Sequence, residues 1–180
     1  MKARDIALGG ILVALTTIVL YATLILPIST LAILTIASAL IPVCIIRSNI
    51  QTSIFVYISS SLIAFFLVPI KISFLYFIFF GVYGIIKYFI EGIRKEKLEI
   101  VLKMVFFNIS FIIGFKIMQN ILDINIIAGL EVLISKVFND SGRTIALIIL
   151  WIVAQPVFLI YDYAMTMIIT FYMERIHKNI

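Results

Sequence analysis

The first apolar segment, residues 6–26, reads IALGGILVALTTIVLYATLIL and contains no charged side chain. At about 1.5 Å of rise per residue, a helix over this segment matches the roughly 30 Å thickness of a bilayer's hydrocarbon core. Lys2 and Arg4 precede it, as basic residues precede the apolar part of a signal peptide. However, the segment is long enough to span, and it ends at Pro27 without a small-residue cleavage site. We therefore expect a retained transmembrane helix.

Five further apolar segments follow, over residues 31–46, 52–67, 72–90, 100–121 and 144–172. Hydrophobic residues make up 64% of the 180-residue chain and charged residues only 13%, against roughly a quarter charged in a soluble domain. A soluble fold of this size could not cover so much apolar surface, so lipid is the expected solvent. The sequence predicts an all-α membrane protein, a bundle of about six transmembrane helices that forms one domain over residues 1–180.

Residues 123–143 differ from these segments. Their apolar residues recur at helical spacing, and Glu131, Lys136 and Asp140 fall between them. The segment is too short and too charged to span, so we expect a short extracellular amphipathic helix on the membrane surface. A turn is predicted at residues 139–142.

Basic residues predict the orientation, because they accumulate on the cytoplasmic side of membrane proteins. With a cytoplasmic N-terminus, ten of the 14 lysines and arginines fall inside and four fall outside. The four outer ones are Lys71, Lys116, Lys136 and Arg143. This predicts a multi-pass protein of the cell membrane with both termini cytoplasmic. It also explains the net charge of +5 without a nucleic-acid partner.

Several kinds of chemistry have no counterpart in the sequence. Cys44 is the only cysteine and His177 the only histidine, so one chain cannot build a disulfide, a cysteine metal cluster or a histidine-based triad. No P-loop, H-E-x-x-H or G-x-S-x-G pattern is present. We expect no enzyme activity, no metal and no cofactor.

Polar side chains within the spans are candidates for function, because each is costly in lipid unless it is satisfied. They fall on one face of the last span, within reach of one face of the fifth, and along the fourth. The candidates are Trp151, Gln155, Asp162 and Thr166, then Asn108, Lys116, Gln119 and Asn120, and then Tyr76 and Lys87.

Structural roles compete with ligand binding at these positions. Asn108 and Gln155 are also typical of hydrogen bonds between helices, and Lys116 of a side chain that reaches the interface. Tyr76 and Trp151 also fit an aromatic belt. For Asp162, one alternative is a structural pair with Lys87 or Lys103, and the other is a coupling or ligand-binding role.

Small residues line one face of the first span, at Ala7, Gly10 and Ala14. Such spacing lets a second helix approach closely. The second helix could belong to this chain or to a partner membrane protein.

This opening run, Arg4-Asp5-Ile6-Ala7 through Gly9-Gly10-Ile11-Leu12-Val13-Ala14-Leu15, resembles the start of the substrate-binding (S) components of energy-coupling factor transporters. The chain length, the six helices and the internal termini also resemble that family. The resemblance implies capture of a vitamin or metal ion from outside. It also implies docking through Ala7, Gly10 and Ala14 on a coupling transmembrane subunit, with separate ATPase subunits.

The family's ligand pocket lies in the outer half, so the resemblance implies ligand-binding roles for particular side chains here. These are Tyr76, Lys116, Gln119, Asn120, Trp151 and Gln155, with residues 123–143 as part of a cap. The link after the first span is shorter than the pocket-closing loop of many S components. The histidine-rich start of the nickel and cobalt members is missing, so the ligand's identity stays open.

The six-helix layout is also similar to small membrane scaffold proteins of cell-shape and sporulation machinery, including the rod-shape-determining proteins. A binding subunit is expected to have an outward-facing polar cavity at Lys116, Gln119 and Gln155. A scaffold is expected to be packed solid there.

Overall fold

The computed structural model describes residues 2–26, 29–120, 132 and 142–176. Over these residues the secondary structure is entirely helical. The elements, with η marking π-helical turns, are α1 (Ala3–Ile25), α2 (Thr30–Arg47), α3 (Ile50–Leu67), α4 (Ile70–Leu75), η1 (Tyr76–Phe80), α5 (Gly81–Glu91), α6 (Glu96–Asn120), α8 (Gly142–Phe171) and η3 (Tyr172–Ile176).

Six spans among the described residues are long and apolar enough to cross a membrane. They are Ala3–Ile25, Thr30–Arg47, Ile50–Leu67, Ile70–Glu91, Glu96–Asn120 and Arg143–Arg175. The predicted all-α membrane fold is therefore confirmed. Most of the surface helix expected over residues 123–143 and of the turn expected at residues 139–142 lies outside the described residues, while Gly142 and Arg143 belong to α8.

Polar residues and prolines set several helix ends. The Asn49 side chain accepts a hydrogen bond from the Thr52 backbone N–H at 2.8 Å, which caps the start of α3. Pro69 precedes α4, where its missing N–H costs nothing. α6 begins four residues earlier than the predicted span. The carboxylates of Glu96 and Glu99 lie in its first turn, where they stabilise the helix by interacting with the positive end of its dipole.

The fourth span is interrupted, which the apolar pattern does not predict. The Gly81 N–H bonds the Tyr76 carbonyl, five residues back, and makes the π-helical turn η1. A Cβ at Gly81 would lie 2.8 Å from the Tyr57 ring of α3. The turn thus coincides with a close contact between α3 and the fourth span.

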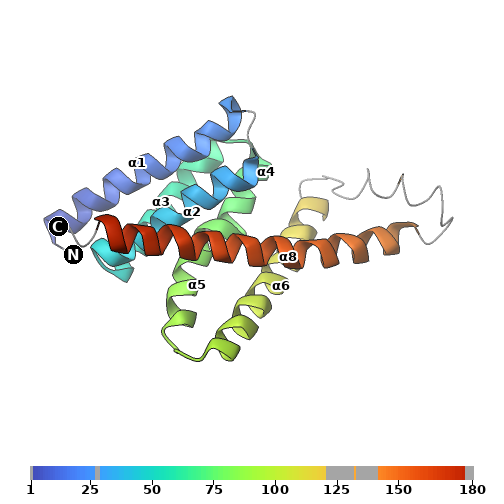
Figure 1. Cartoon of the computed structure of the whole chain (residues 1–180). Helices are drawn as coiled ribbons and strands as arrows, with labels where there is room; N and C mark the ends of the chain where they lie inside the picture. Colours follow the sequence, from blue (N-terminus) through green and yellow to red (C-terminus); the bar gives the residue numbers. More distant parts are fainter. Residues whose placement is uncertain (1, 27–28, 121–131, 133–141, 177–180) are drawn as a thin grey trace.

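Helices α1, α2 and α3 lie together, while α5 and α6 form a hairpin, and α8 crosses beside α2 (Figure 1). The first turn of α1 and the last turns of α8 lie on the same side of the molecule (Figure 1). A chain that crosses the membrane an even number of times must begin and end on the same side. Two glycines permit close packing: a Cβ at Gly9 would lie 3.1 Å from Thr52 Cγ2, and one at Gly84 would lie 2.7 Å from Pro42 Cδ.

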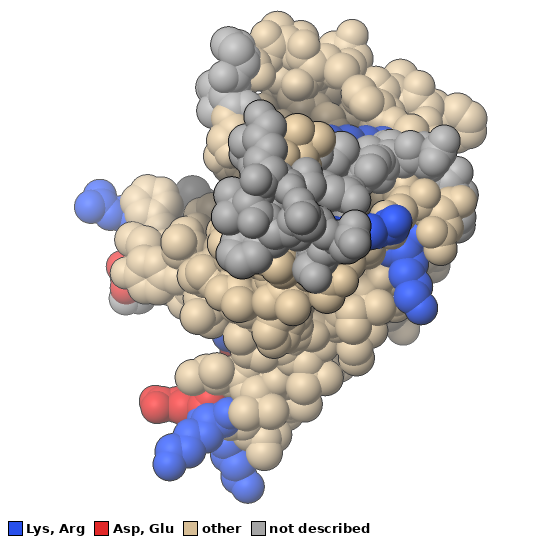
Figure 2. All heavy atoms as spheres, turned by 90° about the vertical axis from the view of Figure 1, so that its right-hand side faces the viewer, with Lys and Arg blue, Asp and Glu red and all other residues tan. Residues whose placement is uncertain are grey.

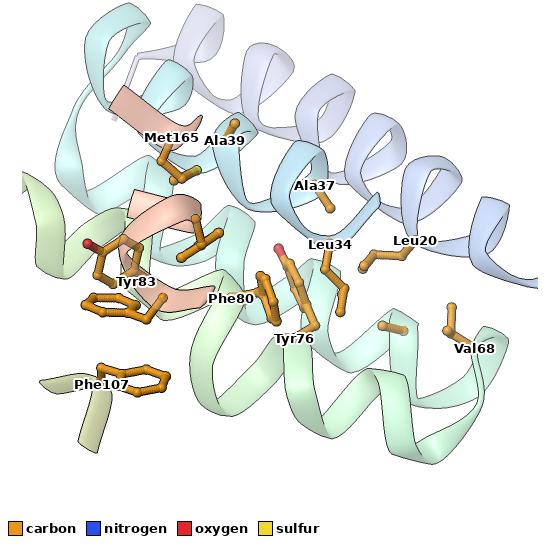
Figure 3. Close-up of a cluster of buried hydrophobic side chains, with 13 residues drawn as sticks. Leu20, Leu34, Ala37, Ala39, Val68, Tyr76, Phe80, Tyr83, Phe107 and Met165 are labelled. Carbon is orange, nitrogen blue, oxygen red and sulfur yellow. The ribbon is translucent and has the colours of Figure 1, made fainter. Parts of the chain in front are cut away.

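The main core contains side chains from α1, α2, α3, η1, α5, α6 and α8, and it is rich in aromatic rings. Leu20 of α1 and Leu34 of α2 pack with Tyr76 and Phe80 of η1 (Figure 3). The Phe107 ring of α6 stacks on that of Phe158 in α8, with centroids 4.6 Å apart. Offset aromatic packing of this kind holds α6 and α8 to the inner helices at one level of the bundle.

The surface carries many large apolar side chains, among them Phe66 at 88% exposure. In the space-filling view, charged side chains gather around the turn between α5 and α6 at the bottom, and a few others project higher up on both sides, with uncharged surface between them (Figure 2). Such a surface is suited to lipid and not to water.

Candidate functional site

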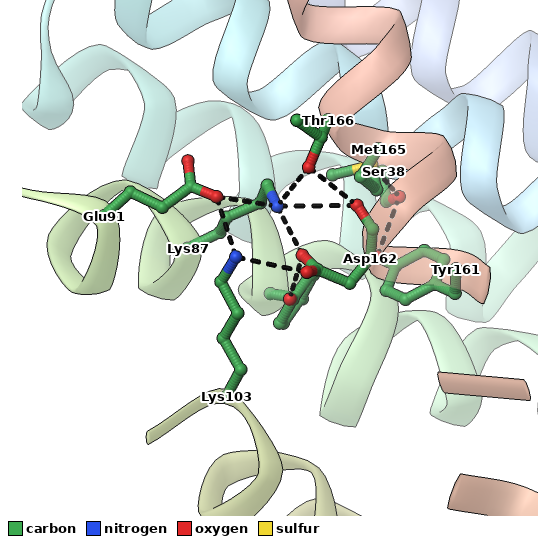
Figure 4. A network of polar contacts seen from close by, with 9 residues as sticks. Ser38, Lys87, Glu91, Lys103, Tyr161, Asp162, Met165 and Thr166 are labelled. Atoms are coloured by element: carbon green, nitrogen blue, oxygen red, sulfur yellow. Dashed lines mark hydrogen bonds and ion pairs between the residues drawn. The ribbon is translucent and has the colours of Figure 1, made fainter. Parts of the chain in front are cut away.

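A network of charged side chains joins α5, α6 and α8 in the half of the bundle predicted to be cytoplasmic (Figure 4). The carboxylate of Asp162, in α8, contacts the ammonium groups of both Lys87, in α5, and Lys103, in α6. The Lys103 Nζ to Asp162 Oδ2 distance is 3.1 Å. The pairing that was one alternative for Asp162 is therefore present, with both lysines as partners.

Glu91 and Tyr83 complete the network. Glu91 Oε1 lies 2.8 Å from the Nζ atoms of both lysines, and the Tyr83 hydroxyl donates to Asp162 Oδ1 at 2.6 Å. Two cations and two carboxylates give no net charge, and Lys87 is only 1% exposed. The network therefore holds three helices together with its charges mutually neutralised.

The sequence contains a signal for Tyr83 and Glu91. Tyr83, Lys87 and Glu91 follow one another at steps of four, which places them on one face of a helix. Glu91 is half-exposed at the end of α5. Its neighbours across the bundle could not be read from the spacing within one helix.

A second polar cluster links α6 to α8. Trp151 Nε1 donates to Asn108 Oδ1 at 2.7 Å, and Gln155 Nε2 donates to the same oxygen at 3.1 Å. Asn108 Nδ2 in turn donates to the Met104 carbonyl at 2.8 Å. Asn108 and Gln155 thus bond across helices, as the structural interpretation of these residues predicted.

The other residues with implied ligand-binding roles differ in their surroundings. Tyr76 is fully buried in the core, and its hydroxyl lies 3.0 Å from Ser60 Oγ. Lys116 and Asn120 are exposed on α6, while Gln119 is half-buried. Trp151 and Gln155 meet at Asn108, and among the described residues no hydrogen bond joins Tyr76, Lys116 or Asn120 to them.

A groove of about 840 Å³ lies between α2, the fourth span, α6 and α8. It extends to Leu31 and Lys71, at the ends of α2 and α4 that are predicted to face outward. Most of its lining is apolar, and aromatic rings are prominent. The rings belong to Phe74, Phe79, Phe80, Phe107, Phe111, Phe115, Phe158 and Tyr161.

Lys71, Thr35 and Ser110 supply side-chain polar groups to this groove. Gly114 also lines it, and a Cβ there would have no atom within 4 Å. The groove can therefore hold a compact apolar or aromatic molecule, with one cation at its outer end.

The small-residue face of α1 does not pack within the chain. Ala7, Gly10 and Ala14 are all exposed, and a Cβ at Gly10 would also meet nothing within 4 Å. The neighbouring Gly9 makes the close contact with α3 instead. Over the described residues, this face is open to lipid or to another membrane helix.

Comparisons with protein-family models, with curated proteins and with solved structures gave no match to this chain. The function is therefore argued from the geometry of the chain itself.

Proposed function

We propose that this chain is a solute-binding membrane subunit of an importer of the energy-coupling factor type. It captures a small, largely apolar micronutrient of the vitamin class from the outer side. It contains no nucleotide-binding P-loop pattern, so the energy comes from separate ATPase subunits through a coupling transmembrane subunit.

The observation that carries this proposal is the aromatic groove between α2, η1, α6 and α8. Its volume of about 840 Å³ lies within the usual range for small-molecule sites, roughly 300–1,000 Å³. Ring faces suit a planar ligand, and the Lys71 ammonium at the outer end suits a ligand with one anionic group.

The open face of α1 supports the second half of the proposal. Ala7, Gly10 and Ala14 leave room for close approach of another helix. A coupling subunit would dock there, opposite to the contact that Gly9 makes with α3.

One observation favours a membrane scaffold as the second candidate. Lys116, Gln119 and Gln155 do not line the groove, and Gln155 is engaged with Asn108. A scaffold would use its open apolar faces for protein contacts and would hold no solute.

The test compares two matched substitutions, Gly114→Leu and Gly10→Leu. Both glycines lie in helices with open space around the position of a Cβ, so both variants are expected to fold. The purified wild-type chain is analysed by mass spectrometry for co-purified small molecules, and its partners are identified by affinity purification from its own host.

We expect Gly114→Leu to lose the bound molecule and keep the partners, because the added leucine side chain would fill the groove. Gly10→Leu should keep the molecule and lose the partners. A wild-type chain that carries no small molecule and shows no thermal shift with vitamins would support the scaffold instead.

A further inference from the structure

A second groove, of about 720 Å³, lies on the predicted cytoplasmic half of the bundle, between α1, α2 and the end of α8. These three elements lie side by side at the left of Figure 1. Apolar side chains form most of its walls. They are Ala7, Leu8, Ile11, Leu12 and Leu15 of α1, Ile36, Ala39, Leu40 and Val43 of α2, and Ile168 and Phe171 of α8.

The groove is as long as one leaflet is deep. On α1 the lining runs from Arg4 to Leu15, and on α2 from Ile36 to Arg47. Each run covers about 16 Å at 1.5 Å per residue, close to half of the roughly 30 Å hydrocarbon core. Since the two helices are antiparallel, both arginines lie at the same end of the groove.

That end carries positive charge at the level expected for lipid headgroups. The Arg47 Nε–H donates to the Tyr172 hydroxyl, and its guanidinium lies 5.8 Å from the centre of that ring. Tyr172 thereby fixes Arg47 at the mouth of the groove and leaves its terminal N–H groups as donors. Arg4 lines the same mouth from the first turn of α1.

Carboxylates near the mouth do not neutralise these arginines by direct pairing. Asp5 follows Arg4 and attracts it, but its carboxylate accepts from the Lys2 backbone N–H at 3.0 Å and from the Ser48 hydroxyl, and it forms no ion pair with Arg4. Among the described residues, neither arginine forms an ion pair with a carboxylate. An anionic group is therefore the chemical complement of this end.

We propose that this groove is a binding site for one anionic phospholipid of the inner leaflet. An acyl chain lies along Ala7, Ile11 and Val43, and the phosphate is bound by Arg4 and Arg47. A partner helix would match the apolar walls, but it would not require two arginines at headgroup depth. This site is separate from the solute groove and does not depend on solute binding, but it shares Ala7 with the face of α1 proposed for docking of a coupling subunit.

The test measures lipid binding to the detergent-purified chain by native mass spectrometry. Phosphatidylglycerol and phosphatidylcholine with identical acyl chains are titrated separately. We expect tighter binding of phosphatidylglycerol, and about a 30-fold loss of its affinity in the Arg4→Gln/Arg47→Gln variant, given the contribution of each basic group at headgroup depth.

Lys95→Gln/Lys97→Gln is the matched charge control, because both lysines are exposed, Lys95 in the turn between α5 and α6 and Lys97 in the first turn of α6. It should leave phosphatidylglycerol affinity within about twofold of wild type. Equal affinity for the two lipids, or an equal loss in the control, would overturn the proposal.

A second pair of variants tests the chain-binding part and keeps both arginines. Ala7→Phe would fill the groove, whereas Ala14→Phe adds the same ring to an exposed position of α1 outside it. We expect Ala7→Phe alone to displace the lipid. If both variants retain phosphatidylglycerol equally, the acyl chain does not lie in this groove.

Discussion

Lys87 shows how a buried cation is accommodated in this membrane protein. Its three ammonium hydrogens have three side-chain acceptors: Asp162 Oδ1, Glu91 Oε1 at 2.8 Å and Thr166 Oγ1 at 2.9 Å. Each acceptor is a different group, so the charge is fully satisfied without water. We therefore expect Lys87 to act as a structural link between α5 and α8.

Lys87→Met is therefore expected to destabilise the bundle by about 3 kcal/mol, because it leaves Asp162 and Glu91 with one cation between them. Thermal unfolding in detergent measures the change. The control is Lys87→Met/Asp162→Leu, which keeps the Lys103–Glu91 pair and should recover most of the loss. An unchanged unfolding temperature in the single variant would contradict the structural role.

Tyr76 provides a second test at the residue scale. Its ring is fully buried, and its hydroxyl lies 3.0 Å from Ser60 Oγ. Tyr76→Phe keeps the ring and removes this bond, so we expect a loss of about 1 kcal/mol in stability. Retention of the co-purified solute should not change, since Tyr76 does not line the groove. Loss of the solute at unchanged stability would restore its predicted ligand role.

Sequence spacing predicts which polar residues share a face of one helix, but not which residues meet across helices. Asp162 was recognised as an unusual charge and its partners Lys87 and Lys103 were among the alternatives, because charges in lipid need partners. Gln155 and Trp151 fell on one face and do meet at Asn108. Spacing alone does not give helix rotation: Tyr76 is buried in the core, whereas Lys116 is exposed.

At the scale of elements, hydropathy placed the helices to within a few residues, because the apolar length needed to cross lipid is fixed. Contacts between helices modify them in ways that hydropathy does not contain. The π-helical turn at Tyr76–Phe80 coincides with the contact of Gly81 and the Tyr57 ring. Neither residue alone signals a change in helix type.

The packing of α2 on α5 depends on Gly84. A Cβ there would lie 2.7 Å from Pro42 Cδ and 3.2 Å from Ile41 Cβ. Since the proline ring cannot rotate away, Gly84→Ala should push the helices apart and cost about 1–3 kcal/mol. Gly114→Ala is the matched control, because its Cβ meets open space. Thermal unfolding of the two variants in the same detergent compares them, and an equal effect would argue against the close α2–α5 contact.

For the whole molecule, the distribution of burial explains why the grooves could not be predicted. In α6 and α8 only 17% of the apolar window is buried, compared with 50% in α2. An apolar side chain has the same hydropathy whether it faces lipid or another helix. The sequence therefore predicts how many helices cross the membrane, but not where they separate to leave an apolar groove.

The orientation of the whole bundle can be tested directly, because it was inferred from the basic residues alone. Lys71 and Lys95 are both exposed, and they lie at opposite ends of the fourth span. In a background where the buried Cys44 is replaced by alanine, Lys71→Cys and Lys95→Cys each present one reactive thiol. With cytoplasmic termini, a membrane-impermeant maleimide added to intact cells should label position 71 and leave position 95 unlabelled, while permeabilised cells should show both. The reverse labelling would invert the bundle. It would then place the arginine-lined groove in the outer leaflet and open the aromatic groove toward the cytoplasm, which would remove the basis for capture of a solute from outside.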